Sequence, residues 1–159
     1  MVGEAIQADG VQAVYEAQHV RLWRAVAVWS GSSDVADDAV AETFAQLVRR
    51  GDAVTDPAAW AWRTAFRIAA AELQRRRSEA HQEFNEVRLP AVQSEPVLDL
   101  MQALQHLSDQ QRACVVLCDL LEYSAEEAAP LLHTSSATVR VQRMRARRRL
   151  RALLEVRDG

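Results

Sequence analysis

Apolar residues recur along most of the chain at spacings of three and four, which is the spacing of one face of an amphipathic helix. In the first half this pattern predicts three helices, over 11–30, 34–50 and 57–77. In the second half, shorter apolar runs predict further helices from about Leu98 to about Leu154. Because no segment alternates apolar and polar residues over the length of a strand, we expect an all-α protein.

Residues with known capping preferences mark the expected helix boundaries. Gly31 and Gly51 follow the first two predicted helices, and glycine is common just after the end of a helix. Asp34 is an N-cap candidate for the second helix. Asp56 followed by Pro57 is a strong start signal for the third helix.

The helical periodicity is lost over residues 78–97, which contain Pro90 and Pro96. We interpret this segment as a linker between two small helical domains, over 11–77 and 98–157, with a short helix that continues to about Phe84 as the alternative for its first part. Fully extended, a linker of this length spans about 66–72 Å. That reach is enough to hold the two domains apart.

Two helices of the C-terminal domain have the dimensions of a helix-turn-helix motif. Ser108 with Gln111, and Ser124 with Glu127, have the spacing of capping boxes and mark two helix starts. The second of these begins a short helix, and after a break over 133–135 a long final helix begins at Ser136. In such motifs the second helix lies in the major groove of DNA.

The composition is that of a globular protein, since 49% of the 159 residues are apolar and 26% are charged. No segment approaches the roughly 20 apolar residues of a membrane span, and the first residues lack the pattern of a secretory signal. The sequence contains only two cysteines, which suits a reducing compartment. We therefore expect a cytoplasmic protein without membrane insertion.

Charge is distributed unevenly along the chain. All 19 basic residues are arginine, and the formal net charge is −3. Residues 91–138 hold seven acidic residues and one arginine, whereas residues 139–159 hold eight arginines and two acidic residues. An acidic protein that ends in such an arginine block is expected to bind a localised anionic partner.

The final helix is expected to bury Val139, Ala146 and Leu150 and to expose an arginine-rich face. Arginine binds phosphate or pairs with the O6 and N7 atoms of guanine, and small apolar residues can contact thymine methyl groups. The alternative is a solvated basic helix end, because the helix dipole favours cations near a C-terminus. Six arginines within residues 143–151 exceed what the dipole requires.

The helix over 57–77 has a second face that combines aromatic and basic residues, namely Trp62, Arg63, Phe66 and Arg67. Exposed aromatic rings among arginines are suited to stacking on unpaired bases. The alternative is that the tryptophans of this helix are ordinary core residues.

The helix over 34–50 is expected to present an acidic face formed by Asp37, Asp38 and Glu42. A catalytic carboxylate pair is a weak interpretation, because no other catalytic group is placed beside it by the sequence. A favourable interaction with the helix dipole or an ionic contact with a basic partner explains these residues better.

Cys114 and Cys118 lie one helical turn apart, but no further ligand nearby completes a metal site. We interpret both as buried small apolar residues. Since the sequence also lacks a recognisable nucleophile or phosphate-binding loop, we expect no enzymatic activity, no cofactor and no metal.

An acidic helix (ADDAVAETF, 36–44), a Trp/Arg helix (DPAAWAWRTAFRIAAAELQRRR, 56–77), a linker and a helix-turn-helix (within 107–154) follow one another in this order. This arrangement resembles the extracytoplasmic-function (ECF) sigma factors, a group within the sigma-70 family of bacterial RNA polymerase. The resemblance covers about 11–154. It implies a sigma factor that directs promoter-specific transcription initiation, with core RNA polymerase and promoter DNA as partners. An anti-sigma factor is a further candidate partner.

The resemblance implies three functional surfaces and a linker that runs toward the active-site channel of the polymerase. Core polymerase would bind Asp37, Asp38 and Glu42. The −10 promoter element would contact Asp52, Thr55, Trp62, Arg63, Phe66, Arg67 and Gln74. The −35 element would contact Ser135, Ser136, Ala137, Thr138, Arg140, Val141, Met144, Arg147, Arg148 and Arg151. In that last set we expect Arg140 to contact a base pair and the later arginines to contact phosphates.

The chain departs from the usual pattern of the family at several positions. Arg67 and Ala71 stand where members usually have Asn and Asp, and Ala41 stands where Gln is frequent. His133 replaces a turn glycine, so a positive φ is expected there for a non-glycine residue. Arg143 replaces a core leucine, so its aliphatic stem is expected to pack along the core while its charge reaches water.

Two other functions compete with this interpretation. A helix-turn-helix transcriptional regulator that binds DNA without promoter melting would not need the acidic pair Asp38 and Glu42. A protein-interaction module would not need the C-terminal arginine block.

Overall fold

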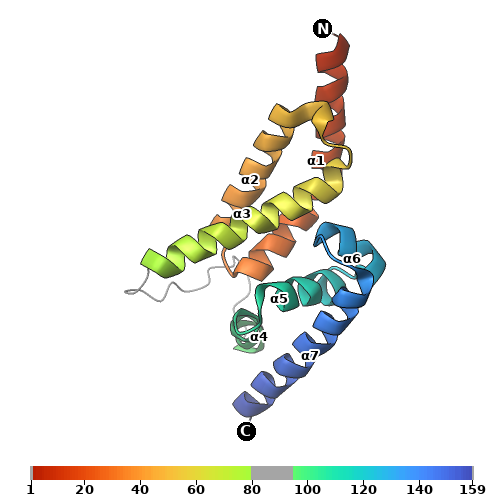
Figure 1. Cartoon of the computed structure of the whole chain (residues 1–159). Helices are drawn as coiled ribbons and strands as arrows, with labels where there is room; N and C mark the ends of the chain where they lie inside the picture. Colours follow the sequence, from red (N-terminus) through yellow and green to blue (C-terminus); the bar gives the residue numbers. More distant parts are fainter. Residues whose placement is uncertain (1, 80–94, 159) are drawn as a thin grey trace.

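A computed structural model describes residues 2–79 and 95–158, and all of their regular structure is helical, which confirms the all-α prediction. The elements are α1 (Val2–Ser30), α2 (Ser33–Arg50), the 3₁₀ turn η1 (Gly51–Ala53), α3 (Pro57–Glu79), α4 (Glu95–Gln105), α5 (Asp109–Val115), the π-helical turn η2 (Val116–Leu120), α6 (Ala125–Leu131) and α7 (Ser136–Asp158). Helices α1–α3 form one half and α4–α7 the other, with the two chain ends at opposite ends of the molecule (Figure 1).

Local capping chemistry sets most helix boundaries. The carboxylate of Asp56 accepts a hydrogen bond of 3.1 Å from the backbone N–H of Ala59, which confirms Asp56 as the N-cap of α3. The N-cap of α2 is Ser32 rather than Asp34, because Ser32 has extended backbone angles and its Oγ accepts from the N–H of Val35 at 3.2 Å. Asp34 lies in the first turn of α2, where a negative charge also favours the helix.

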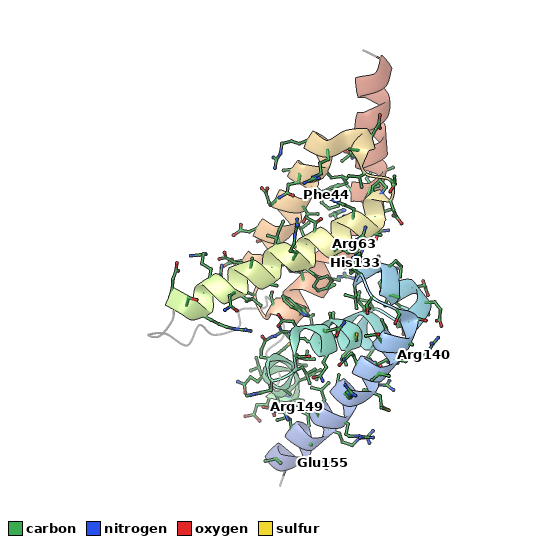
Figure 2. The ribbon with its side chains drawn as sticks, in the orientation of Figure 1. Phe44, Arg63, His133, Arg140, Arg149 and Glu155 are labelled. Carbon is green, nitrogen blue, oxygen red and sulfur yellow. The ribbon has the colours of Figure 1, made fainter. Side chains whose placement is uncertain are left out.

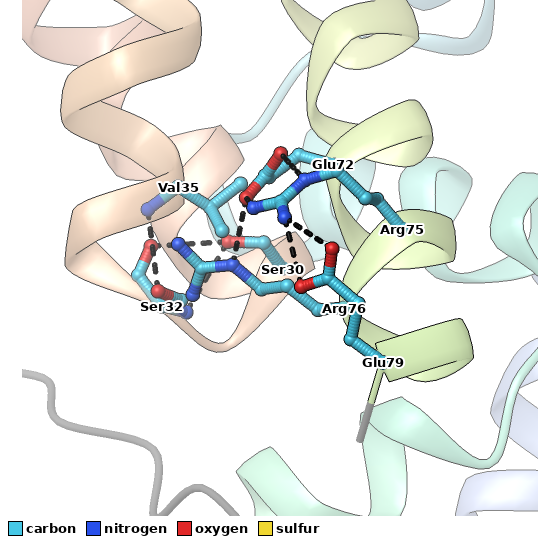
Figure 3. A network of polar contacts seen from close by, with 7 residues as sticks. All are labelled: Ser30, Ser32, Val35, Glu72, Arg75, Arg76 and Glu79. Atoms are coloured by element: carbon cyan, nitrogen blue, oxygen red, sulfur yellow. Dashed lines mark hydrogen bonds and ion pairs between the residues drawn. The ribbon is translucent and has the colours of Figure 1, made fainter. Parts of the chain in front are cut away.

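Ion pairs reinforce the C-terminal end of α3. Glu72 accepts hydrogen bonds from Arg75 at 2.6 Å and from Arg76 at 2.9 Å, and Arg75 also pairs with Glu79 at 2.8 Å (Figure 3). Pairs three and four residues apart stabilise a helix, and α3 ends at Glu79, two residues beyond its predicted end. Residues 80–94, which make up most of the predicted linker, lie outside the described residues.

Three other helices also extend beyond their predicted ends. Helix α1 begins at Val2 rather than at residue 11, α4 begins at Glu95 rather than near Leu98, and α7 continues to Asp158. Periodicity marks only the part of a helix that faces a core, so it does not define ends that project into solvent. Both predicted capping boxes of the C-terminal half are present.

One apolar core runs through both halves of the molecule. It includes Leu22 and Trp29 of α1, Trp62 of α3, Leu117 of η2 and Ala128 of α6. A second, smaller core joins α4, α5 and α7, and Val28 of α1 packs against it. The linker length allows the halves to lie apart, but in this structure they are packed together.

The indole ring of Trp29 is the centre of this junction. Its Nε1 donates to the backbone oxygen of Asp109 at 3.0 Å, and its ring contacts Phe66 edge to face at a centroid distance of 5.5 Å. The guanidinium of Arg112 lies 4.4 Å from the centroid of the same ring, a cation–π contact that gains strength when it is shielded from water. The amide of Gln105 donates to the backbone oxygen of Trp29 at 3.3 Å.

Arg112 is fully buried in the same junction. It donates to Gln105 at 2.6 Å and to Asp109 at 2.9 Å, while its Nε has no partner among the described residues. Burial lowers the pKa of Arg112 to about 10, against the opposing effect of Asp109, so the side chain stays charged at neutral pH. Burying such a cation is costly unless it is paired, and the stack on Trp29 supplies one of its few compensating contacts.

We predict that Trp29→Ala lowers the free energy of unfolding of the whole chain by about 3–5 kcal/mol, as removal of a fully buried aromatic side chain does. Urea denaturation followed by circular dichroism measures this. Val48→Ala is the control, because Val48 is exposed on α2 and its change should stay within about 0.5 kcal/mol. A loss below about 1 kcal/mol for Trp29→Ala would show that the two halves do not depend on this ring.

Candidate nucleic-acid interface

The turn before α7 fixes where its N-terminal residues lie. The Oγ of Ser135 accepts from the backbone N–H of Thr138 at 3.1 Å and donates to its Oγ1 at 2.9 Å, so both hydroxyls take part in the helix cap. His133 has φ 55°, which confirms the predicted positive φ. Its Nδ1 lies 3.3 Å from Nη1 of Arg63 on α3, so the turn touches the other half of the molecule (Figure 2).

Helix α7 buries one face and exposes the other, as predicted. Val139, Ala146 and Leu150 are buried, and Val141 and Met144 are exposed. The exposed face also carries Ala137, Arg140, Arg147, Arg148 and Arg151, while Ser136 is half-buried. A shallow concavity along this face is lined by Arg140, Arg143, Met144, Arg147, Arg148 and Arg151.

Acidic side chains from the preceding elements contact three of these arginines. Glu126 of α6 forms an ion pair with Arg140. Asp119 of η2 accepts from Nη2 of Arg143 at 2.8 Å and from Nη2 of Arg147 at 2.5 Å. Arg148 and Arg151 have no ion pair among the described side chains. Part of the basic face is therefore neutralised from within the protein.

Sequence reasoning missed Asp119, Glu126 and the position of Arg143. Arg143 does not simply extend its charge past the core, because it forms a two-point contact with Asp119 through Nε at 3.2 Å and Nη2. The pair is separated by 24 positions, so no local pattern connects the two residues. The only available signal was the unexpected arginine at a position where the family usually has leucine.

The pKa of Asp119 shows that this pair is ionised. Partial burial raises the pKa, but the hydrogen bonds from Arg143 and Arg147 outweigh burial and hold it below the ordinary value for aspartate. Asp119 is therefore negatively charged at neutral pH.

On α3 the structure corrects the expected exposure of the aromatic rings. Trp62 is completely buried, so the alternative of an ordinary core residue holds for this tryptophan. Phe66 is nearly buried as well. Trp62 donates to Oε1 of Gln18 at 2.9 Å, and its ring contacts Tyr123 edge to face at 5.6 Å. Trp62 thus packs between α1 and the segment that follows η2, whereas Phe66 packs against Trp29 of α1.

The remaining residues of the predicted −10 surface are accessible to different degrees. Arg67 and Gln74 on α3, and Asp52 and Thr55 before it, are exposed, whereas Arg63 is half-buried beside His133. Exposed polar side chains therefore remain on and before α3 even with the halves packed together.

The acidic face of α2 is exposed, as predicted. The carboxylate of Asp37 accepts from Nε1 of Trp23 at 2.7 Å. Glu42 accepts from Gln46 at 2.9 Å and from Arg49 at 3.2 Å, and these contacts, Gln46 first, lower its pKa. Asp38 has no side-chain partner among the described residues.

A shallow apolar groove beside this acidic face was not predicted. It is lined by Tyr15, His19, Val20, Trp23, Asp37, Val40 and Ala41. Tyr15 and His19 stack with ring centroids 4.2 Å apart, and Tyr15 and Val20 are exposed. The spacing of Tyr15 and His19 along α1 was a usable signal, since residues four apart share one helix face.

Cys114 and Cys118 are buried and unpaired, as expected for small core residues. Burial raises the pKa of Cys114 to about 11, so this thiol is not activated. Over residues 2–79 and 95–158, no cluster of three or more potential metal ligands is present, and no helix is long and apolar enough to cross a bilayer.

Comparisons with known proteins agree with this geometry. Residues 97–150 match the family described as Sigma-70, region 4. The ECF RNA polymerase sigma factor SigM of Mycobacterium tuberculosis, from the Erdman and H37Rv strains, is 30% identical over 147 residues, which cover 89% of this chain and 75% of SigM.

Two solved structures share the fold. The sigma factor RpoE from Bartonella quintana, in complex with the anti-sigma factor NepR, is 24% identical with a TM-score of 0.68, covering 94% of this chain and 96% of RpoE. CnrH, in complex with the cytosolic domain of CnrY, is 24% identical with a TM-score of 0.71, covering 98% of this chain and 96% of CnrH.

Proposed function

Since the chain belongs to the ECF sigma factors and directs RNA polymerase to promoters, we propose that three of its surfaces divide this task. The acidic face of α2 binds core polymerase, α3 with the preceding loop contacts the −10 element, and α7 contacts the −35 element. The observation that carries this proposal is the separation of charge, with an exposed acidic face in one half and an exposed arginine-rich face in the other. Members of the family are generally not enzymes, and we propose no catalytic activity for this chain.

Asp38 and Glu42 are the central residues of the proposed polymerase contact. Both are exposed, and neither is required by the N-cap of α2, which Ser32 supplies. The adjacent groove offers the exposed ring of Tyr15. A charged rim beside an apolar groove is a common arrangement in protein interfaces.

We predict that Asp38→Arg with Glu42→Arg abolishes run-off transcription by core polymerase on genomic promoter fragments, whereas the wild-type chain supports it. Reversing two exposed charges replaces attraction by repulsion at the interface and leaves the helical circular dichroism unchanged.

The charge-matched control is Glu95→Arg with Glu155→Arg, which reverses two exposed acidic residues of the other half. This control should still yield transcripts and be retained by core polymerase in a pull-down. Wild-type retention of the α2 double variant would overturn the assignment of this face.

Arg140 is the proposed direct contact with a base pair of the −35 element. It lies in the second turn of α7 and projects from its exposed face (Figure 2). Its ion pair with Glu126 is exposed on both sides, and exposed pairs contribute about 0–1 kcal/mol. DNA can therefore replace Glu126 as the partner of Arg140 at small cost.

We predict that Arg140→Ala costs about 1–3 kcal/mol at the preferred promoter and relaxes preference at one or two base pairs. Arg148→Ala should weaken all sequences alike and reduce the salt slope of binding by about one, as loss of a phosphate contact does. Binding selections on a randomised upstream element measure both effects. Uniform loss of affinity with unchanged preference in Arg140→Ala would make Arg140 a phosphate contact.

For the −10 element we propose that Asp52, Thr55, Arg67 and Gln74 contact DNA from their exposed positions on and before α3. Trp62 and Arg63 join them only when the C-terminal half moves away, because Tyr123 packs against Trp62 and His133 lies beside Arg63. Phe66 packs against Trp29 of its own half and reaches DNA only by leaving that contact. At 3.4 Å per base pair, the −10 and −35 elements lie on the order of 55–60 Å apart. That separation supports an open arrangement on promoter DNA.

An anti-sigma partner is also part of the proposal. RpoE of Bartonella quintana shares this fold and has been solved with an anti-sigma factor. In the present chain the exposed apolar groove between α1 and α2 is the surface that we assign to such a partner. A partner seated there would compete with polymerase for the adjacent acidic face.

A further inference from the structure

Asp119 contacts two arginines of α7 on the basic face. One carboxylate oxygen, Oδ1, accepts from Arg143 at 2.8 Å and from Arg147 at 2.5 Å, while Oδ2 accepts from Nε of Arg143 at 3.2 Å. The contact to Arg143 is thus two-pronged, a geometry that strengthens ion pairs between arginine and carboxylates. A single anion holds two cations, each of which lines the concave face.

This arrangement differs from the pair between Arg140 and Glu126. The side chains of Arg140 and Glu126 are 57% and 62% exposed, whereas those of Arg143 and Asp119 are 35% and 20% exposed. Water and DNA compete effectively with an exposed pair and much less with one that is partly shielded and bonded at two points. Arg147 makes a single contact with Asp119 and its side chain is 56% exposed, close to the value for Arg140. On meeting DNA, Arg140 and Arg147 are therefore released, while Arg143 stays with Asp119.

We propose that Asp119 withholds Arg143 from the phosphates of DNA and so determines how strongly promoter recognition depends on sequence. This inference rests on the proposed role of α7 in DNA binding. Contacts with phosphate raise affinity for every sequence alike. By removing one of them, Asp119 leaves base contacts such as that of Arg140 with a larger share of the affinity.

The test uses the full chain, because the outer face of α7 is exposed with the halves packed together. Fluorescence anisotropy is measured over a series of salt concentrations, on a promoter fragment chosen by run-off transcription and on a scrambled duplex. We expect Asp119→Asn to steepen the salt slope by about one, as one added phosphate contact would. Affinity for the scrambled duplex should rise several-fold, and the ratio between the two duplexes should fall.

Glu126→Gln is the matched control, because it removes the same charge from the exposed pair. Its salt slope should stay at the wild-type value, since Arg140 already engages DNA in the wild-type chain. An unchanged or shallower slope in Asp119→Asn would overturn the inference, the shallower slope showing that Asp119 instead positions the arginines for phosphate contact.

A second pair of variants decides the matter even if Asp119→Asn fails to fold. Arg143→Gln should leave the salt slope unchanged, whereas Arg148→Gln should lower it by about one. A decrease for Arg143→Gln equal to that for Arg148→Gln would overturn the inference. A wild-type chain without salt-dependent binding would instead overturn the proposed role of α7 in DNA binding. Failure of that role is thereby distinguished from failure of the inference about Asp119.

Discussion

The stack of Arg112 on Trp29 is the contact on which the arrangement of the two halves depends. Trp29 lies in the last turn of α1, and its ring is bonded to the backbone of α5 and covered by a cation from α5. Among the described residues, Arg112 is buried with its Nε unpaired, and its contacts in the junction are this ring, Asp109 and Gln105. The junction is thus specific: an apolar contact holds the halves together, and a buried charge fixes their relative position.

Packing the halves together has opposite consequences for the two proposed DNA surfaces. On α3 it brings Tyr123 against Trp62, a ring suited to stacking on an unpaired base. On α7 the arginine-rich face stays exposed. The acidic residues that contact Arg140, Arg143 and Arg147 belong to the C-terminal half, like α7 itself. Recognition of an upstream duplex is compatible with the packed arrangement, whereas capture of a base by α3 requires the halves to part.

Much of the fold could be predicted from the sequence because helix starts and turns are local. Asp56 before Pro57 and the capping box at Ser124 specify their helices within four residues, and His133 was recognisable as a left-handed turn residue. The burial of Trp62 under Tyr123 and the pairing of Asp119 with Arg143 depend on residues far apart in the chain. Periodicity correctly predicted that Trp62 lies in a helix. It does not distinguish a helix face exposed to water from one that packs against the other half of the molecule.

The distance between the halves, in the free chain and on a promoter, tests this account most directly. Exposed Ala45 on α2 and Ala152 on α7 can each be changed to cysteine and labelled for a spectroscopic distance measurement, while Cys114 and Cys118 remain buried. The account predicts one short, narrow distance distribution for the free chain and a shift to longer distances with core polymerase and promoter DNA. A broad, long distribution already present in the free chain would contradict it.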